Sequence, residues 1–385
     1  MRVVINALNI HPGGGLTVIL GLLQSLRAAK PDWTLIVLTS QERTHNAVIQ
    51  TKAADQVERL LPDGSAGWLY FWQNTCLGAW LRRRHVDVMI NVNHLLWNVH
   101  CPQIVYHLNL LRFQKLHPLG PGSFSERLRD HGARRAVAHA AANVFESRYL
   151  REAAETVCNR PAHNASIVYI GLPDELIALA ARDGLPSKKS RRIMCITSPT
   201  EHKDNPTLIR MLAELVKVDP GADWQLDIAG GRDKRVWEPL IQIAREWNVS
   251  DRITFHGFCS QDDLTRLLDG ALCLVSTSRV ESFAMVALEA MARHCPPIVA
   301  DCASMPESIG SAGLLASAGD EKSFAAAVLR LANSPELHHE FVNRGAQRVA
   351  GFRWKDCGLA FARVIEQLIS QNGANQSESC LQKAG

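Results

Sequence analysis

Residues 281–292 read E-S-F-A-M-V-A-L-E-A-M-A, and this stretch decides how the rest of the chain is interpreted. It follows an apolar run at 271–275 and a polar turn at 276–279, which is the order of a strand, a loop and a helix. On one continuous helix, Glu281 and Glu289 would lie about 80° apart around the axis and about 12 Å apart along it. We therefore expect two carboxylates at opposite ends of one helix face, each holding a different part of an elongated ligand.

The size and composition of the chain indicate a soluble enzyme of two domains. A chain of 385 residues is long for a single core, and 46% hydrophobic with 21% charged residues is ordinary for a globular protein. No apolar run reaches the roughly 18 residues that a membrane span needs, and the N-terminus lacks the layout of a signal peptide. The ten cysteines form no C-x-x-C pair and several lie in apolar runs, so we expect free, buried thiols and no metal site. These features together predict a cytoplasmic location.

The basic excess lies entirely in the first half of the chain. Residues 1–175 carry 18 Lys and Arg against 13 Asp and Glu, whereas the remainder carries 24 against 25. This asymmetry predicts an anionic partner for the first half, such as a membrane surface or a phospholipid-linked acceptor. Nucleic acid is the least favoured partner, because the basic residues would have to form one continuous stripe.

Strand-like runs alternate with helix-length segments, the pattern of parallel sheets covered by helices. The strands are expected at 2–8, 34–39, 86–92, 103–108, 142–146, 166–170, 192–196, 224–229, 252–256, 271–275, 297–300 and 314–316. The segment 183–191 is rich in Gly, Pro, Ser and charge and is the predicted linker. We therefore expect an N-terminal Rossmann-like domain at 1–182, a C-terminal one at 192–370 whose last helix can cross back to the first domain, and a flexible tail at 371–385.

The stretch quoted above resembles the signature of retaining glycosyltransferase family 4, E-G-F-G-x-x-x-x-E-A-M-A-x-G-x-P-V. The chain keeps Glu281, Phe283, Pro296 and the run E-A-M-A at 289–292, and continues into a matching S-M-P-E at 304–307. The resemblance implies an α/β protein of the GT-B fold, with two Rossmann-like domains facing across a cleft and a C-terminal helix packing back. It also implies donor binding in the C-terminal domain and acceptor binding on the N-terminal one.

The same resemblance assigns roles along this stretch. Glu281 would contact hydroxyls of the donor sugar, and Glu289 would hold the ribose of the nucleotide, since a carboxylate accepts hydrogen bonds from adjacent hydroxyls. The start of the helix, at Ser282, Phe283 and Ala284, would offer backbone N–H groups to the diphosphate. The family's glycines are replaced here by Ser282 and Ala284, and their Cβ atoms narrow the approach of a phosphate to the backbone.

A phosphate-binding lysine is expected at Lys203, in the sequence S-P-T-E-H-K-D-N-P. In the family, the lysine at this place reaches the donor diphosphate and is accompanied by an arginine five residues earlier. That earlier position is Ser198 in this chain, and a hydroxyl cannot replace a bidentate guanidinium. Arg232, in A-G-G-R-D, is the candidate substitute, although a solvated loop arginine is an equally good interpretation.

Two further candidates lie in the first half. The glycine turn at Gly13, Gly14 and Gly15 follows the first strand and allows close approach of a phosphate or sugar to backbone amides. His107 ends a strand where the family often has His-Asp facing the reaction centre. It is predicted to be catalytic together with Glu281 and Lys203, but a hydrogen-bonded core histidine fits equally well.

An aromatic and basic surface in the first half predicts peripheral contact with an anionic membrane. Tryptophans recur at helical spacing before three consecutive arginines, and an alanine-rich helix downstream adds four more. The residues are Trp68, Trp72, Cys76, Trp80, Arg82, Arg83, Arg84, Arg127, Arg129, Arg134 and Arg135. The alternative is that the tryptophans pack inward and the arginines are only solvated.

The resulting hypothesis is a retaining transfer of a mannose-like or glucose-like hexose to a glycan or polyprenyl-linked acceptor at the inner face of the plasma membrane. The donor would be a GDP- or UDP-linked sugar, with no other cofactor, in surface polysaccharide or lipopolysaccharide assembly. The chain has no D-x-D sequence, which argues against a metal-bridged diphosphate. The alternatives are a nucleotide-sugar 2-epimerase and a catalytically inactive GT-B subunit, which the missing arginine at position 198 keeps open.

Overall fold

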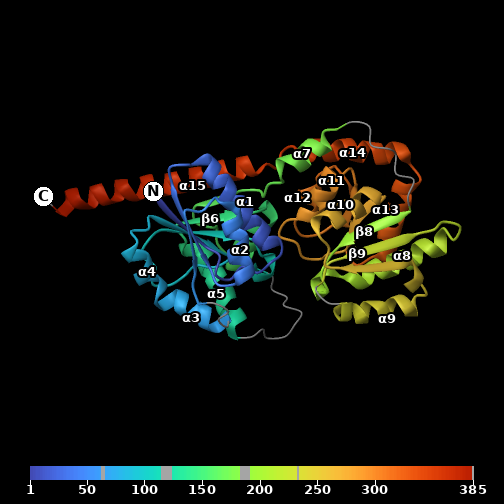
Figure 1. Cartoon of the computed structure of the whole chain (residues 1–385), viewed down its shortest axis with the longest axis horizontal. Helices are drawn as coiled ribbons and strands as arrows, with labels where there is room; N and C mark the ends of the chain where they lie inside the picture. The colour runs from blue at the N-terminus through green and yellow to red at the C-terminus, as the bar shows by residue number, and fades with distance from the viewer. Residues whose placement is uncertain (62–65, 114–123, 183–190, 232–233, 384–385) are drawn as a thin grey trace. The chain divides into compact units, whose positions relative to one another are not determined.

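Apolar runs separated by helical segments form two parallel β-sheets in the computed structural model of the chain (Figure 1). The structure describes all residues except 62–65, 114–123, 183–190, 232–233 and 384–385, and it describes no side chains at 66, 124–126, 234 and 372–383. By internal contacts the chain divides into a first unit, Met1–Gly171 with Trp354–Gly385, and a second unit, Leu172–Arg353. Each unit is an α/β domain, as the alternation of strand and helix patterns predicts.

The first unit contains a seven-stranded parallel sheet in the order β3-β2-β1-β4-β5-β6-β7. Its central strands are buried on both faces, which explains why they read as continuous apolar runs such as L-I-V-L at 35–38. The strands are β1 (Arg2–Asn6), β2 (Thr34–Thr39), β3 (Gln56–Arg59), β4 (Val88–Val92), β5 (Gln103–His107), β6 (Ala142–Phe145) and β7 (Ala165–Ile167).

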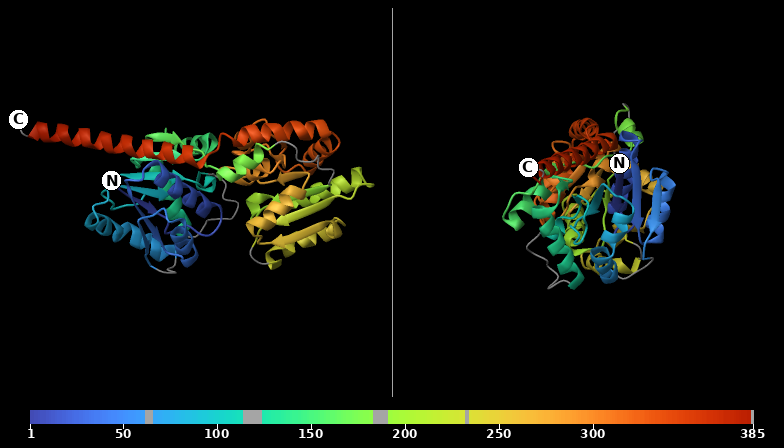
Figure 2. Two further views of the ribbon diagram at one scale, coloured as in Figure 1. Left: turned by 45° about the horizontal axis from the view of Figure 1, so that its top comes forward. Right: turned by 90° about the vertical axis from the view of Figure 1, so that its left-hand side faces the viewer.

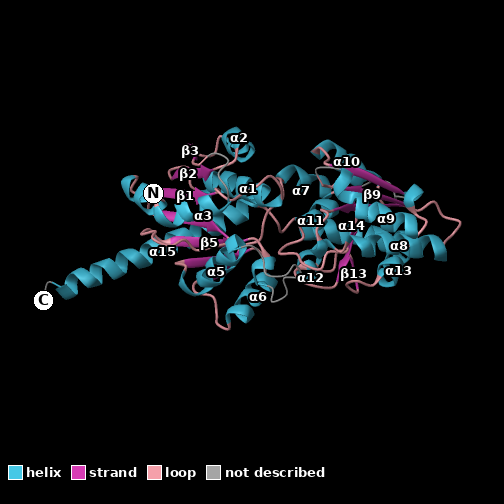
Figure 3. Ribbon diagram, turned by 90° about the horizontal axis from the view of Figure 1, so that it is seen from below, coloured by secondary structure: helices cyan, strands magenta, loops and turns pink. Residues whose placement is uncertain are grey.

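Helices lie on both faces of the first sheet (Figure 3). They are α1 (Gly14–Ala29), α2 (Glu42–Thr51), α3 (Ala66–Thr75), α4 (Leu77–Arg83), α5 (Phe124–His139), α6 (Arg148–Cys158) and α15 (Trp354–Lys383). The C-terminal helix α15 packs along α1, as expected (Figure 2). The approach is close because two glycines face it: a Cβ on Gly21 would lie 2.3 Å from the Trp354 ring, and one on Gly358 would lie 2.4 Å from the Ser25 carbonyl oxygen.

The second unit contains a six-stranded parallel sheet in the order β10-β9-β8-β11-β12-β13. Its strands are β8 (Arg192–Ile196), β9 (Gln225–Ala229), β10 (Ile253–Gly257), β11 (Cys273–Ser276), β12 (Pro297–Ala300) and β13 (Leu314–Ala316). Its helices are α7 (Asp174–Ala180), α8 (Asn205–Val218), α9 (Glu238–Glu246), α10 (Gln261–Gly270), α11 (Met285–Ala292), α12 (Met305–Ile309), α13 (Glu321–Ala332) and α14 (Pro335–Val349). Trp224, Trp237 and Phe324 are among the fully buried side chains of its core.

The twelve strands expected from the sequence are present, and the structure adds β3. This strand lies at the edge of its sheet and reads Q-V-E-R, with a single apolar residue, so hydrophobic periodicity could not reveal it.

The units and the chain ends differ from the expected ranges. The expected linker at 183–191 lies almost wholly outside the described residues, and the chain passes into the second unit at Leu172. The reason is that α7 packs against α11 and α14. The expected tail at 371–385 is instead helical to Lys383, because residues 371–383 contain no proline and a single glycine.

Two further observations concern disulfide bonds and membrane-spanning helices. The nine cysteines whose side chains are described form no disulfide bond, and four of them are buried. Within the described part of the chain, no helix combines the length and the apolar character of a membrane span.

Candidate functional site

The order in which the chain adds strands to the second sheet reverses between β8 and β11. From β8 the chain moves outward to β9 and β10, and from β11 it moves the other way to β12 and β13. The loops that leave the carboxyl ends of these two neighbouring strands therefore diverge, which is the usual position of a ligand site in a parallel α/β sheet. One of these loops carries Lys203 and the other carries Glu281.

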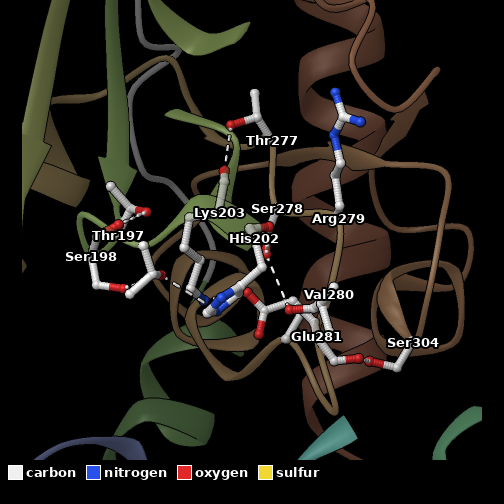
Figure 4. Close-up of polar contacts among 12 residues, drawn as sticks. Thr197, Ser198, His202, Lys203, Thr277, Ser278, Arg279, Val280, Glu281 and Ser304 are labelled. Carbon is white, nitrogen blue, oxygen red and sulfur yellow. Dashed lines mark hydrogen bonds and ion pairs between the residues drawn. The ribbon is translucent and has the colours of Figure 1, made fainter. Parts of the chain in front are cut away.

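Hydrogen bonds hold these two loops together (Figure 4). The Thr277 hydroxyl lies 3.0 Å from the carbonyl oxygens of both Lys203 and Asp204. The Arg279 backbone N–H donates to the His202 carbonyl at 2.8 Å, and its side-chain Nε donates to the Asp204 carboxylate at 2.8 Å. The position of each loop is thus tied to that of the other, and together the two loops form one platform at the carboxyl edge of the sheet.

Lys203 and Glu281 meet on this platform although they lie 78 residues apart in the chain. The Lys203 Nζ donates to Glu281 Oε1 at 2.5 Å, and the two side chains retain 22% and 16% exposure. Both charged groups are partly accessible to a ligand. A ligand that presents an anion to Lys203 and hydroxyls to Glu281 can replace each partner of the pair, so that neither charge is left without a hydrogen bond.

His202 is a third titratable group of the site, and the sequence analysis did not select it. Its half-buried imidazole lies beside Lys203 and Glu281, with Nε2 3.4 Å from the Thr200 hydroxyl (Figure 4). Burial is the main cause that lowers the pKa of His202, the charge of Lys203 lowers it further, and that of Glu281 opposes both. The available signal was its position immediately before the lysine in the same loop.

Ser198 lies in the same loop, with its hydroxyl 3.1 Å from that of Thr200. It therefore occupies the position where the family has an arginine, without supplying a charge. Arg232, the candidate substitute, lies outside the described residues.

Glu281 is not helical, which corrects the expected arrangement of the two glutamates. Helix α11 begins at Met285, and 281–284 form a loop. The Ser304 hydroxyl donates to the Glu281 carbonyl at 2.8 Å, and the Ala284 N–H donates to the Ser308 hydroxyl at 3.1 Å. These contacts, from residues more than twenty positions later, hold the loop out of the helix and occupy the Ala284 N–H that we expected to be available for phosphate.

The other residues of this stretch have different surroundings. Phe283 is buried, and its ring centre lies 5.6 Å from that of Phe352, so its role is packing. Ser282 is partly exposed in the loop. Glu289 lies inside α11 between buried apolar residues, and burial raises its pKa to about 7. Burial thus favours the protonated form of this carboxyl.

The catalytic prediction for His107 is not supported. The residue ends β5 but is fully buried, with its ring stacked on Phe145 at a centroid distance of 4.5 Å. Its Nε2 donates to the Asn143 side-chain oxygen at 2.8 Å, while the Asn143 amide nitrogen donates to the His163 carbonyl. Burial lowers the pKa of His107 to about 4, so the ring is neutral. This is a hydrogen-bonded core histidine.

The glycine turn of the first unit is open. Helix α1 begins at Gly14, and Gly13 precedes it with φ +142°, a conformation that favours glycine. Gly13 and Gly14 are exposed and Gly15 is partly exposed. A Cβ on Gly13 would meet no atom within 4 Å, so the glycine serves the backbone conformation and leaves free space beside the turn.

The strand order of the first sheet also reverses, between β1 and β4. A chain of hydrogen-bonded, buried side-chain amides lies at this reversal point. The Asn6 side-chain nitrogen lies 2.9 Å from the side-chain oxygens of both Gln73 and Asn91, and Asn91 donates to Gln103 at 2.8 Å. All four side chains are buried. These groups satisfy one another and carry no charge.

Some of the aromatic side chains that we predicted to form a surface on α3 and α4 pack against the core, and others are exposed. Trp72 and Trp80 pack against the hydrophobic core, so the expectation that they face outward is wrong. Trp68 and Phe71 are about half exposed, and their rings stack at 5.5 Å. Arg82 and Arg83 on α4 are also exposed.

Residues 180–348 match the family model described as "Glycosyl transferases group 1". The matched segment lies within the second unit and contains Lys203, Glu281 and Glu289.

Curated proteins with similar sequences are glycosyltransferases. The chain is 27% identical over 212 residues to D-inositol 3-phosphate glycosyltransferase of Streptomyces griseus, covering 52% of this chain and 44% of that protein. It is 28% identical over 242 residues to alpha-1,3/1,6-mannosyltransferase ALG2 of Mus musculus, covering 59% and 57%. It is 29% identical over 129 residues to O-antigen chain mannosyltransferase B of Escherichia coli, covering 33% and 32%. The chain thus spans from about a third to just over half of the length of these relatives.

Solved structures match nearly the whole chain. Sucrose-phosphate synthase from Thermosynechococcus elongatus superposes with a TM-score of 0.77 at 18% identity, covering 96% of this chain and all of that one. Anabaena HepE in complex with UDP superposes with a TM-score of 0.72 at 16% identity, covering 95% and 100%. At these identities the likeness establishes the fold, which is GT-B as predicted.

Proposed function

We propose that this chain, whose residues 180–348 match the glycosyltransferase group 1 family model, transfers a hexose from a nucleoside diphosphate sugar to a glycan or lipid-linked acceptor with retention of configuration. The observation that carries the proposal is the contact between Lys203 and Glu281 at the reversal point of the second sheet. A donor of this kind carries an anion and a set of hydroxyls, and the site offers a cation and a carboxylate side by side.

Donor binding would separate this ion pair. The Lys203 ammonium would turn to a diphosphate oxygen, and the released Glu281 carboxylate would accept hydrogen bonds from the sugar. His202 is placed to add a second donor to the diphosphate, in the loop where Ser198 supplies no charge. A dianion nearby favours its protonated form, so we expect His202 to take up a proton when the donor binds.

Glu289 would hold the nucleotide ribose, as the family resemblance implies. The ionised carboxylate is the better acceptor for the two ribose hydroxyls. Because burial raises the pKa of Glu289 to about 7 in the free protein, nucleotide binding would favour the ionised form of this group.

Transfer would proceed on one face of the sugar. The acceptor hydroxyl oxygen bonds to the anomeric carbon while the bond from that carbon to the phosphate oxygen breaks, and the leaving diphosphate takes the hydroxyl proton. Lys203, His202 and Arg232 are the cations that would stabilise the leaving group, in a chain whose sequence has no D-x-D.

The acceptor and the setting follow from analogy. Among the relatives is a mannosyltransferase whose name refers to an O-antigen chain, which favours surface polysaccharide or lipopolysaccharide assembly. The open turn at Gly13 and Gly14 offers backbone amides to an acceptor on the first unit. Trp68, Phe71 and Arg82 would bring this unit to an anionic membrane on its cytoplasmic face.

The experiment that tests the function is a panel of GDP- and UDP-linked sugars incubated with and without polyprenyl-linked or glycan acceptors. The proposed transferase releases nucleoside diphosphate at a rate that rises at least tenfold with one acceptor. A 2-epimerase would convert the donor with no acceptor present, and an inactive subunit would consume no donor in any combination. Either result would contradict the proposal.

A further inference from the structure

Two adjoining hollows lie at the amino-terminal edge of the first sheet. The larger has a volume of about 830 Å³ and is lined by residues that immediately precede β4, β5 and β6, including Asp87, Cys101 and Ala141. The smaller, of about 430 Å³, shares Arg135 and His139 with it. This edge is opposite to the one where the glycine turn follows β1, so the hollows are separate from the predicted acceptor region.

Basic side chains outnumber acidic ones around these hollows. Their described lining contains three arginines and four histidines, among them Arg134, Arg160 and His163. The single carboxylate in that lining is Asp87, which accepts the backbone N–H of Arg2 at 2.7 Å. A concave surface lined in this way concentrates anions.

Arg135 occupies the boundary between the two hollows and has an unsatisfied donor. Its Nη1 is buried and has no hydrogen-bond partner, and no described carboxylate lies within 4 Å of its guanidinium. The group is held by the Trp97 ring, whose centre lies 5.5 Å from Cζ. A guanidinium that is oriented by an aromatic ring and lacks a carboxylate partner can donate to an anionic ligand at this boundary.

We propose that the two hollows form a binding site for a phosphate ester, gripped by the Arg135 guanidinium and surrounded by the arginines and histidines of α5 and its neighbours. A phosphate presents several acceptor oxygens and matches the planar fork of arginine. The excess of cationic and imidazole groups over carboxylates suits a phosphate better than a single carboxylate. The site is independent of the donor site, which lies in the second unit.

The ester could be the headgroup of a phospholipid or a soluble phosphate compound, and two measurements separate these sources. Both use the Lys203→Ala chain, so that phosphate binding at the donor site does not contribute. The first is calorimetric titration with sn-glycerol 3-phosphate. The second is co-sedimentation with vesicles of phosphatidylcholine containing about a third phosphatidylglycerol.

The variant Arg135→Gln should weaken whichever binding is observed at least fivefold. The matched control is Arg43→Gln, which removes an exposed arginine from α2, outside both hollows, and should change it less than twofold. Binding of glycerol phosphate that depends on Arg135 supports a soluble ligand, and vesicle binding alone that depends on Arg135 supports a lipid headgroup.

No binding in either measurement, or equal binding by Arg135→Gln and Arg43→Gln, overturns the proposal. If Arg135→Gln unfolds, the exposed pair Arg134→Gln and Arg160→Gln replaces it with the same criterion, since neither side chain is buried.

Discussion

The two sheets share the same order of strands around their reversal points but differ in what they place there. In the second unit, the edge between β8 and β11 carries Lys203, His202 and Glu281, which are charged or titratable and in contact with solvent. In the first unit, the edge between β1 and β4 carries a chain of buried amides through Asn6 and Asn91. One topology therefore supports two electrostatically different edges.

This difference determines which of the two edges could bind an ionic ligand. The partly accessible ion pair of the second unit can exchange its partners for those of an ionic ligand, because an anion can replace the carboxylate at Lys203 and hydroxyls can replace the ammonium at Glu281. The amide chain of the first unit has no such freedom, because breaking any link would leave a buried polar group without a partner. Topology thus locates a possible site, whereas side-chain charge and exposure decide whether the position can bind an ionic ligand.

The largest effect is expected from the charged edge. Lys203→Ala should lower kcat/KM about 100-fold, since charge-assisted contacts to a diphosphate contribute up to about 3 kcal/mol. Steady-state release of nucleoside diphosphate measures it. The matched control is Lys217→Ala, on the exposed face of α8, which should retain full activity. A loss of less than threefold in Lys203→Ala would remove this residue from the site.

A substitution in the buried core of the first unit should lower the stability of the protein but leave its activity unchanged. His107→Asn removes a ring that stacks on Phe145 in the core and should lower the free energy of unfolding by about 2 kcal/mol. The turnover of the folded variant should stay within threefold of wild type. Urea unfolding and the rate per folded molecule are the two measurements. A large loss of turnover at unchanged stability would restore the catalytic role that the sequence suggested.

Glu289 gives the second unit a distinctive dependence on pH. Its pKa is about 7 in the folded protein and near 4.5 when unfolded, so the folded state binds more protons between these values. Stability contributed by this group is therefore present below pH 4.5 and is lost as pH rises through 7. Glu289→Gln cannot ionise and should be more stable than wild type by about 2 kcal/mol at pH 8, with the difference narrowing towards pH 5. Ligand-free urea unfolding at four pH values tests this, and a constant difference would contradict it.

The smallest effect concerns the surface of the first unit. Trp68→Ser with Phe71→Ser should reduce binding to anionic vesicles about threefold, since both rings are only half exposed. The corresponding change at Trp247, an exposed tryptophan of the second unit, is the control and should have no effect. Equal behaviour of the two variants in co-sedimentation would mean that α3 does not contact the membrane.

The sequence predicts most of this fold because buried parallel strands read as apolar runs. What it could not predict depends on contacts between distant residues. The segment at 281–284 has a helical pattern, but it forms a loop whose backbone is bonded to the Ser304 and Ser308 hydroxyls. The burial of His107 depends on Asn143, which lies on the adjacent strand.

The family signature located Lys203 and Glu281 without revealing that they form an ion pair. A local sequence pattern can identify single candidate residues. Which of these residues come into contact depends on the order of the strands in the sheet. His294 illustrates the limit: it stands where the family has a glycine, and the structure gives it φ +55°, a conformation that glycine adopts without strain.

The most direct test of the central claim is calorimetric titration of the wild-type chain and of Lys203→Ala with UDP and GDP. We expect one of the two nucleotides to bind the wild type with a Kd below about 1 mM and to bind Lys203→Ala at least tenfold more weakly. Absence of binding by both nucleotides at millimolar concentration, or equal affinity of the two proteins, would contradict the assignment of the charged edge as a nucleotide-sugar site.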